Sequence, residues 1–457
     1  MGKGKNMRRT ILALAAFIIA LPGSAQADRH SDTLTINHWR MWLIDNGIFG
    51  QTPGGGAGGE WPLVSRHKYV FGAGLWVGAV PGDTLTSVSY DPFSGNCEFT
   101  PGDSLGGPSD TLVRMYTYRH RWPAPAGRFP RAPQNRISDQ DAWCCFNDFD
   151  STKHDSGGRP MGLQVYQTAY ASQHPSVQDA VFLRYEVENQ SAGPLPAVYL
   201  GLAFDYDIGG AMDDCYRGFY RQWFHRGSGD SIYLDNLVCG YSEPEPGWDT
   251  TGTVAIGLVR TPGNHGVASM KYYDLFGFNP GGDKTQYLVM SGFDIRRGVY
   301  APIDTFGGPP SDLRVLVSVG PFDLAPGQSE SLVVVMVGVN CRPDVDSLRI
   351  AEAVWTAESA YLAGLPYGIQ EPGQGAPPGA SPSSSIASLV HGVLFLGDCP
   401  RTGTVPKTAL LDISGRKVLE LEPGANDVRA LAPGVYFVRE AWAQAQAQAV
   451  RKVVLTR

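Results

Sequence analysis

The sequence predicts a mostly β protein: a large body of β-sandwich type with one helix near its end, and a small β-sandwich at the C-terminus. Short runs of β-branched and aromatic residues recur along the chain, separated by turns rich in its 56 glycines and 34 prolines. Such spacing is typical of sandwiches and barrels. Only one segment has apolar residues at the helical period, and one Pro/Gly/Ser-rich stretch, 371–385, interrupts the pattern.

The first 27 residues have the pattern of a secretory signal peptide. Arg8 and Arg9 supply a positive start, 11–21 is an apolar run too short to cross a bilayer, and Ala25 to Ala27 reads A-x-A. We therefore expect export and a mature chain that begins at Asp28. No other stretch approaches about eighteen apolar residues, so we expect no transmembrane anchor.

The mature chain is acidic. Loss of the leader's four basic residues lowers the net charge from −7 to −11. Proteins bind a phosphate backbone through clustered Lys and Arg, so nucleic acid is not an expected partner.

Seven cysteines lie in the mature part, and because this number is odd at least one thiol stays unpaired. Exported proteins commonly form disulfides, and Cys215 and Cys239, which flank an aromatic stretch, are the best local pair. We leave open whether they are bridged. Cys144 and Cys145 are adjacent, which strains a bridge between them. No C-x-x-C spacing signals a zinc or redox site.

The body, 28–370, is expected to contain two clear hairpins, and we leave open whether it divides into two lobes. In the first hairpin, a strand run over 68–80 turns and returns over 84–90. In the second, the strands 179–188 and 197–205 are joined by a loop with Asn, Gly and Pro. Further strands are expected at 111–118, 162–171, 231–241, 253–259, 286–291, 313–319 and 330–339.

The predicted helix covers 346–365. Its N-terminus has a capping residue in Asp346 or Ser347. Its apolar residues share one face: Leu348, Ala351, Trp355 and Leu362.

The linker 371–385 follows, and its composition favours an extended, flexible chain. It separates the body from a C-terminal module, 386–457. The short strands of this module are expected at 410–413, 418–421, 435–439 and 450–455. The Ala/Gln tract 441–449 lies between the last two strands and is expected to be a hairpin loop.

Three segments of the module carry a resemblance: Gly415-Arg416, Gly434 to Tyr436 and Lys452 to Val454. On them, the module resembles the C-terminal sorting domain of the bacterial type IX secretion system. The resemblance implies that the type IX machinery is a partner through residues 386–457, and that the protein reaches the cell surface or the medium. The body is similar, over 197–209 and 320–327, to secreted bacterial proteins of unassigned function, which implies no activity.

Gly102 to Gly106 reads G-D-S-L-G, which matches both the nucleophile elbow G-x-S-x-G and the motif of the GDSL esterases. The elbow requires a strand before Ser104 and a helix after it, whereas Gly107 and Pro108 follow here. The esterases also need a later D-x-x-H, which this chain lacks. We predict a surface turn.

Four carboxylates crowd the segment 205–214: Asp205, Asp207, Asp213 and Asp214. Bent by two glycines, this segment suits Ca²⁺, which takes oxygen ligands. It is not an EF-hand, because Tyr216 stands where that loop has its bidentate Glu. We predict these four aspartates as calcium ligands. The alternative is an acidic turn satisfied by its own backbone N–H groups.

A second acidic cluster, 139–150, surrounds an apolar strand. Its carboxylates could share an ion with the first cluster, or supply the pair that glycoside hydrolysis needs. Aromatic residues also cluster, in 38–42, 61–62, 116–118 and 219–223. Sugar-binding surfaces use such rings, although most aromatic residues fill cores.

No group of residues forms a convincing catalytic set. We therefore expect a non-catalytic binding or structural exoprotein of the cell surface, with a glycan or another surface component as partner and no cofactor beyond Ca²⁺. The alternative is a secreted hydrolase that acts on polysaccharide or peptide. Two carboxylates converging in a cleft would favour the hydrolase.

Overall fold

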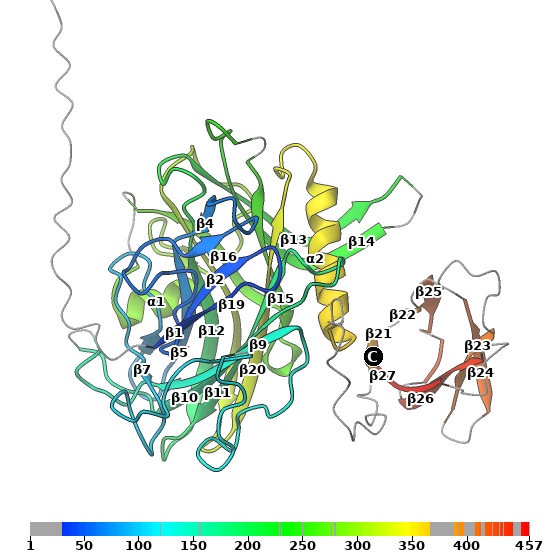
Figure 1. The fold of residues 1–457 in the computed structure, drawn as a ribbon, viewed down its shortest axis with the longest axis horizontal. Coiled ribbons are helices and arrows are strands. Elements are labelled where there is room, and N and C mark those ends of the chain that lie inside the picture. Colours follow the sequence, from blue (N-terminus) through cyan, green and yellow to red (C-terminus); the bar gives the residue numbers. More distant parts are fainter. Residues whose placement is uncertain are drawn as a thin grey trace, which may run out of the picture.

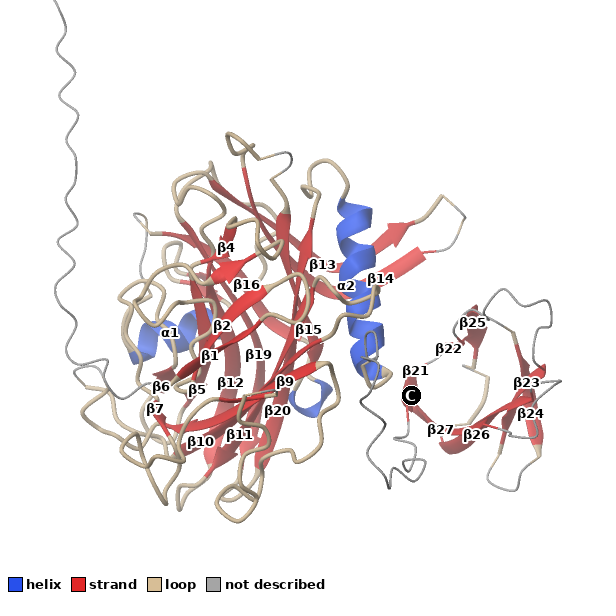
Figure 2. Cartoon of the chain, viewed as in Figure 1, coloured by secondary structure: helices blue, strands red, loops and turns tan. Residues whose placement is uncertain are grey.

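The computed structural model describes residues 30–365, apart from 119, 155–156, 228, 230, 249–250, 276 and 278–279, and, with gaps, 388–456. The predicted signal peptide 1–27, the predicted linker 371–385 and most of the Ala/Gln tract lie outside the described residues. Strands dominate the rest, and helices are few (Figure 2). The predicted fold class, mostly β with sandwich-type packing, is confirmed.

The larger sheet of the body has nine antiparallel strands. Their order is β13-β14-β15-β20-β11-β10-β9-β7, with β8 paired to β9. The strands are β7 (Thr100–Pro101), β8 (Tyr116–Thr117), β9 (Gln140–Asn147), β10 (Leu163–Ala171), β11 (Ala180–Asn189), β13 (Asp214–His225), β14 (Ser231–Ser242), β15 (Thr253–Arg260) and β20 (Ser329–Val339).

A second antiparallel sheet has five strands in the order β16-β19-β12-β5-β6. They are β5 (Gly72–Ala79), β6 (Leu85–Val88), β12 (Leu195–Asp205), β16 (Val267–Asp274) and β19 (Leu313–Leu324). Four N-terminal strands form a smaller sheet: β1 (Ser31–Leu34), β2 (Arg40–Ile44), β3 (Gly59–Glu60) and β4 (Lys68–Val70). The two-stranded ribbon pairs β17 (Phe293–Asp294) with β18 (Val299–Tyr300), and a short 3₁₀ turn covers Pro262–Asn264.

The main core lies between the two large sheets (Figure 1). Val165 and Val334 of the nine-stranded sheet and Leu200 and Val317 of the five-stranded sheet belong to one buried cluster. These strands are buried on both faces over most of their length, because helices and loops cover their outer sides. The apolar runs in the sequence therefore mark interior strands of a sandwich.

One predicted hairpin is confirmed and the other is wrong. β5 and β6 pair across the turn after Ala79, as expected. β11 and β12, however, do not pair with each other: β11 lies between β10 and β20, and β12 lies between β5 and β19. The loop 190–194 thus crosses from one sheet to the other. Its turn chemistry is real, because Asn189 Oδ1 accepts a hydrogen bond from Ser191 N, but a turn does not specify the strand's partner.

A second helix, α1 (Asp283–Met290), replaces the strand predicted at 286–291. Val289 and Met290 pack in a cluster with Trp76 of the five-stranded sheet, so the apolar run is buried on one helical face. Short apolar runs of this kind do not distinguish a strand from a buried helical turn. The strand predicted at 111–118 shrinks to the two residues of β8 for a similar reason, since turns occupy most of that segment.

The helix α2 (Ser347–Leu362) agrees with the prediction in position and in three of the four residues of its predicted face, since Leu348, Ala351 and Trp355 pack in the cluster between helix and sheet. Asp346 caps it, since its carboxylate accepts a hydrogen bond from Arg349 N at 3.0 Å. The fully buried residues are Ile350, Ala351, Val354 and Ala357. Leu362, placed on the apolar face by the sequence pattern, is 51% exposed. The buried face packs against β14, β15 and β20 on the outer side of the nine-stranded sheet. In the described part of the chain, no helix is both long and apolar enough to cross a membrane.

The cysteines within the described residues are all buried free thiols. The proposed pair Cys215 and Cys239 is therefore not bridged. In the register of β13 and β14, Cys215 lies opposite Tyr241 and Cys239 lies opposite Arg217. The two thiols are thus displaced by two residues along the ribbon, a relation that the sequence does not reveal.

The C-terminal module forms two sheets of its own. A five-stranded sheet has the order β21-β27-β26-β23-β24, and β22 pairs with β25. The strands are β21 (Ser388–His391), β22 (Val393–Leu396), β23 (Lys407–Leu411), β24 (Lys417–Leu421), β25 (Gly424–Asp427), β26 (Gly434–Ala441) and β27 (Ala449–Thr456). Leu410, Leu421 and Val438 are in its core. All four predicted strands are present, and β26 and β27 pair as expected on either side of the Ala/Gln tract.

Candidate functional site

The GDSL-like segment is a tight surface turn, as predicted. Asp103 and Gly106 form an isolated β-bridge, and Asp103 Oδ1 accepts hydrogen bonds from the backbone of Leu105 and Gly106. The carboxylate of Asp103 also forms an ion pair with Arg128 at 2.7 Å. Asp103 therefore holds the turn closed, and no helix follows Ser104 to aim its hydroxyl.

The second acidic cluster, 139–150, secures backbone turns around β9. Asp139 accepts hydrogen bonds from Ser172 Oγ and Gln173 N, and Asp148 accepts from Met161 N and Leu163 N. None of these carboxylates belongs to the group of closely spaced acidic side chains found among the described residues. The two acidic clusters do not converge there on a shared ion.

The structure brings together only two of the four predicted calcium ligands. Asp205 and Asp207 lie together at the end of β12, and each has a carboxylate oxygen within 4.8 Å of the other's and of one on Asp312. Asp213 and Asp214 are not part of this group. Asp214 Oδ1 instead accepts a hydrogen bond from Ile208 N at 3.2 Å, which fastens the loop between β12 and β13.

Arg314 and Tyr90 complete the surroundings of this acidic group, defined as Asp205, Asp207 and Asp312. Arg314 lies directly opposite Asp205 in the register of β12 and β19, and its Nη2 is 3.3 Å from Asp205 Oδ2. The same guanidinium forms an ion pair with Asp312. The Tyr90 hydroxyl donates to Asp205 Oδ2 at 3.1 Å.

Burial dominates the electrostatics of this region. It raises the pKa of Asp205 to about 7, although Arg314 opposes the shift, and it raises the pKa of Asp207 in the same direction. Burial also raises the pKa of Asp214 to about 10, against the hydrogen bond from Ile208. These carboxyl groups therefore take up a proton at higher pH than an exposed aspartate does.

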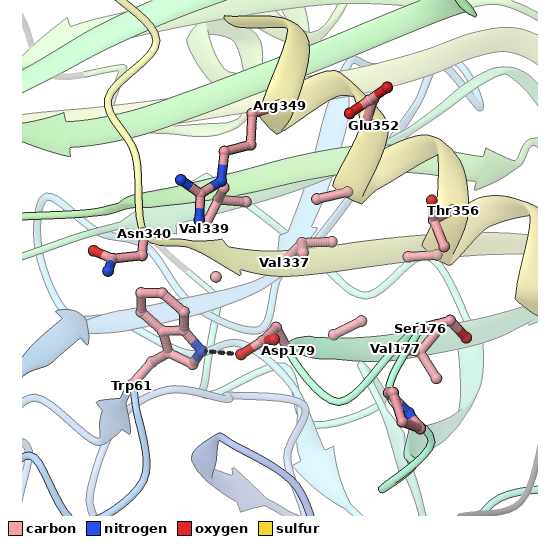
Figure 3. A pocket seen from close by; sticks show the side chains of 15 residues that line it. Trp61, Ser176, Val177, Asp179, Val337, Val339, Asn340, Arg349, Glu352 and Thr356 are labelled. Atoms are coloured by element: carbon pink, nitrogen blue, oxygen red, sulfur yellow. Dashed lines mark hydrogen bonds between the residues drawn. The ribbon is translucent and has the colours of Figure 1, made fainter. Parts of the chain in front are cut away.

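A cavity of about 390 Å³ lies beside the first turns of α2 (Figure 3). Its walls are α2, the end of β20 and the loop before β11. Trp61 closes one side, with its ring against Gly338 of β20 and its Nε1 donating to Asp179 Oδ1 at 2.8 Å. The apolar lining consists of Val177, Ala180, Val337, Val339, Ala353 and Ala357.

Polar side chains form the rim of this cavity. Arg349 extends from α2 towards Trp61 and Asn340, and its guanidinium forms no ion pair within the described part of the chain (Figure 3). The two carboxylates of the rim are already engaged. Asp179 accepts from Trp61 and is 2.8 Å from His38 Nδ1, and Glu352 pairs with Arg226 Nε at 2.7 Å.

The contact between Trp61 and Gly338 gives a testable expectation for this wall of the cavity. A Cβ atom at Gly338 would lie 2.4–2.7 Å from three atoms of the indole, closer than real Cβ contacts. Because Trp61 is buried and hydrogen-bonded, we expect Gly338→Ala to lower the free energy of unfolding by about 1–3 kcal/mol. Urea denaturation measures this, with Gly193→Ala as control, since no atom lies within 4 Å of a Cβ there. Equal losses in both variants would contradict the packing described here.

The sequence missed Asp312, Arg314 and Arg349 as neighbours of a site, whereas Trp61 belongs to one of the aromatic clusters considered for sugar binding. Asp312 and Arg314 lie two residues apart at the start of a predicted strand. No local sequence pattern indicates that this strand pairs with the one that ends at Asp205. The prediction that most clustered aromatics fill cores is confirmed for Trp39 and Trp61. Trp223, in the cluster 219–223, is an exception: it is 55% exposed and packs against Tyr233 across the β13–β14 ribbon.

No family model matches this chain, and no curated protein matches it either. Among solved structures, the chain has similarity to a polysaccharide lyase at 10% identity and a TM-score of 0.27, covering 94% of this chain and 46% of the lyase chain. A second structure, the protein HI1317, matches at 10% identity and a TM-score of 0.21, over 68% of this chain and 99% of its own. This chain thus spans less than half of the lyase chain, and likenesses this weak assign it to no family.

Proposed function

We propose that this protein is an exported binding protein of the cell surface that holds a short saccharide in the cavity beside α2. The observation that supports the proposal most is the lining of the cavity, an apolar floor with a rim of hydrogen-bonding side chains. Export is supported by the leader pattern of 1–27 and by the resemblance of 386–457 to a type IX sorting domain. The type IX machinery is then the partner that delivers the protein.

The lining suits the chemistry of a sugar. A saccharide presents hydroxyl groups that donate and accept hydrogen bonds, together with apolar C–H faces. Arg349 and Asn340 supply donors, Thr356 and Ser176 supply hydroxyls, and the valines and alanines of the floor supply the apolar contact. The volume of about 390 Å³ lies within the range of roughly 300–1,000 Å³ that small-ligand sites occupy.

A hydrolase acting on polysaccharide or peptide is the second candidate, and one observation favours it: Asp179 and Glu352 both line the cavity. Glycoside hydrolysis uses two carboxylates, one of which must give or take a proton. Here each carboxylate is held by its own donor, Asp179 by Trp61 and Glu352 by Arg226. These bonds fit a structural role for both carboxylates, which is why we rank binding first.

The mature protein, screened on an array of oligosaccharides, is expected to bind at least one of them. Arg349 is exposed and has no ion-pair partner among the described residues, so Arg349→Ala removes a donor without disturbing the core. We expect this variant to lose at least tenfold in affinity by titration calorimetry. Arg121→Ala, an exposed arginine that does not line the cavity, is the matched control and should bind as the wild type does.

A parallel screen for turnover of polysaccharides and peptides separates the two candidates. Turnover that is abolished by Asp179→Asn or Glu352→Gln would establish the hydrolase and reject the non-catalytic role. Absence of any saccharide binding, or equal affinity in Arg349→Ala, would reject the saccharide site.

A further inference from the structure

Three carboxylates from two neighbouring strand ends converge at the acidic group. Asp205 is the last residue of β12, Asp207 follows two residues later, and Asp312 immediately precedes β19, the strand that pairs with β12. One oxygen from each lies within 4.8 Å of one oxygen on each of the others. Ca²⁺–oxygen distances of roughly 2.3–2.6 Å allow two ligand oxygens on opposite sides of one ion to be about 5 Å apart. The spacing therefore fits a single ion.

The Asp205 carboxyl is incompletely satisfied by the protein. This side chain is only 1% exposed, and its Oδ2 is held by Tyr90 and Arg314. Its Oδ1 is buried and has no hydrogen-bond partner among the described residues. A buried acceptor without a donor or an ion is unfavourable, and native structures avoid leaving one. This oxygen is an observation separate from the clustering of the acids, and it indicates a missing cationic ligand.

The net charge of the acidic group also favours a bound cation. When all three carboxyl groups are ionised, they and the guanidinium of Arg314 leave two negative charges, which one divalent cation balances. Arg314 cannot swing to serve all three acids, because its Nε donates to Pro92 O at 3.1 Å and so fixes the plane of the guanidinium. Asp207 is partly exposed, which leaves room for water to complete the coordination.

We propose that Asp205, Asp207 and Asp312 bind one divalent cation, with Ca²⁺ as the preferred ion. Ca²⁺ accepts six to eight oxygens in flexible geometry, whereas Mg²⁺ demands a near-ideal octahedron that a loop and two strand ends do not impose. The site retains two of the four predicted ligands and exchanges Asp213 and Asp214 for Asp312. It is independent of the proposed saccharide site.

Titration of the metal-free mature protein with Tb³⁺ alone tests the proposal, with luminescence excited through nearby tyrosines such as Tyr90. We expect one bound ion per chain, displaced by Ca²⁺ at lower concentration than by Mg²⁺. Asp207→Asn and Asp312→Asn should each weaken binding at least tenfold. Asp213→Asn is the matched control, because it removes a carboxylate from the same loop but outside the group, and it should bind as the wild type does.

Circular dichroism checks whether each variant is folded. If Asp312→Asn unfolds because Arg314 loses its partner, Asp207→Asn still provides the test, since Asp207 is partly exposed. The proposal is overturned if the wild type binds no ion at millimolar Ca²⁺, or if Asp207→Asn binds as tightly as the wild type. Loss of binding in Asp213→Asn with retention in Asp312→Asn would place the ion in the loop instead.

Discussion

Deletion of residues 386–457 is expected to hold the protein in the periplasm of a type IX-competent host, with none of it at the cell surface. The body should remain folded, because among the described residues no strand of the module hydrogen-bonds to a strand of the body. The module also has a core of its own around Leu410 and Val438. The predicted signal peptide lies within 1–27 and is kept in the truncated chain, so we expect that chain to cross the inner membrane and stop there. Cell fractionation and protease accessibility of intact cells measure the distribution.

Two controls distinguish loss of the sorting signal from misfolding of the truncated protein. A deletion inside the linker, 374–382, shortens the connection but keeps the module, and it should leave surface delivery unchanged. The thermal melting transition of the truncated body should match that of the body in the full chain. Surface delivery of the truncated protein would show that 386–457 is not the sorting signal.

The second large effect concerns Glu358, a half-buried acid on α2. Glu358 lies against Gly257 of β15: a Cβ atom added to Gly257 would be 2.8 Å from Glu358 Oε1. Within the described residues, Glu358 forms no ion pair. Burial, with a smaller contribution from Asp235, raises the pKa of Glu358 to about 8. Because the folded-state pKa is raised, stability from this group is complete below the unfolded pKa of 4.5 and is lost as pH rises towards 8.

We therefore expect Glu358→Gln to be more stable than the wild type by about 2–4 kcal/mol at pH 8, and by much less at pH 5. The amide keeps the shape of the side chain but never carries the buried charge. Urea denaturation at both pH values measures the difference. Glu352→Gln on the same helix is the control, since its side chain is 42% exposed and paired with Arg226, and such pairs contribute about 1 kcal/mol or less. A pH-independent difference for Glu358→Gln would contradict the assignment.

Local sequence signals predicted the positions of the strands and helices far better than they predicted which strands pair with each other. The strands β10, β14, β15, β19 and β20 and the capped start of α2 follow from residue type, turn chemistry and periodicity, all of which act within a few residues. The helix α1 was missed because the short apolar run 287–290 fits either structure, and the contact with Trp76 decides in favour of the helix.

The candidate sites show the same division. The sequence located Asp205 and Asp207 on a glycine-bent segment after a strand, which was enough to suggest an ion. It assigned Asp213 and Asp214 to the same site because they are close in the chain, whereas the structure turns Asp214 towards Ile208 N. Trp61 and Arg349 meet across the cavity only because β20 and α2 bring distant segments together.

The sequence by itself determined the composition of the elements, the leader pattern and the separate C-terminal module, because each depends on neighbouring residues. Only the tertiary structure decided that β12 pairs with β19 and not with β11, and that Asp312 and Arg314 therefore join Asp205. Strand pairing is selected by burial on both faces of each sheet and by cross-strand contacts between residues far apart in the chain. No local pattern encodes that choice, so the partners of a buried carboxylate emerge only when the two sheets are packed.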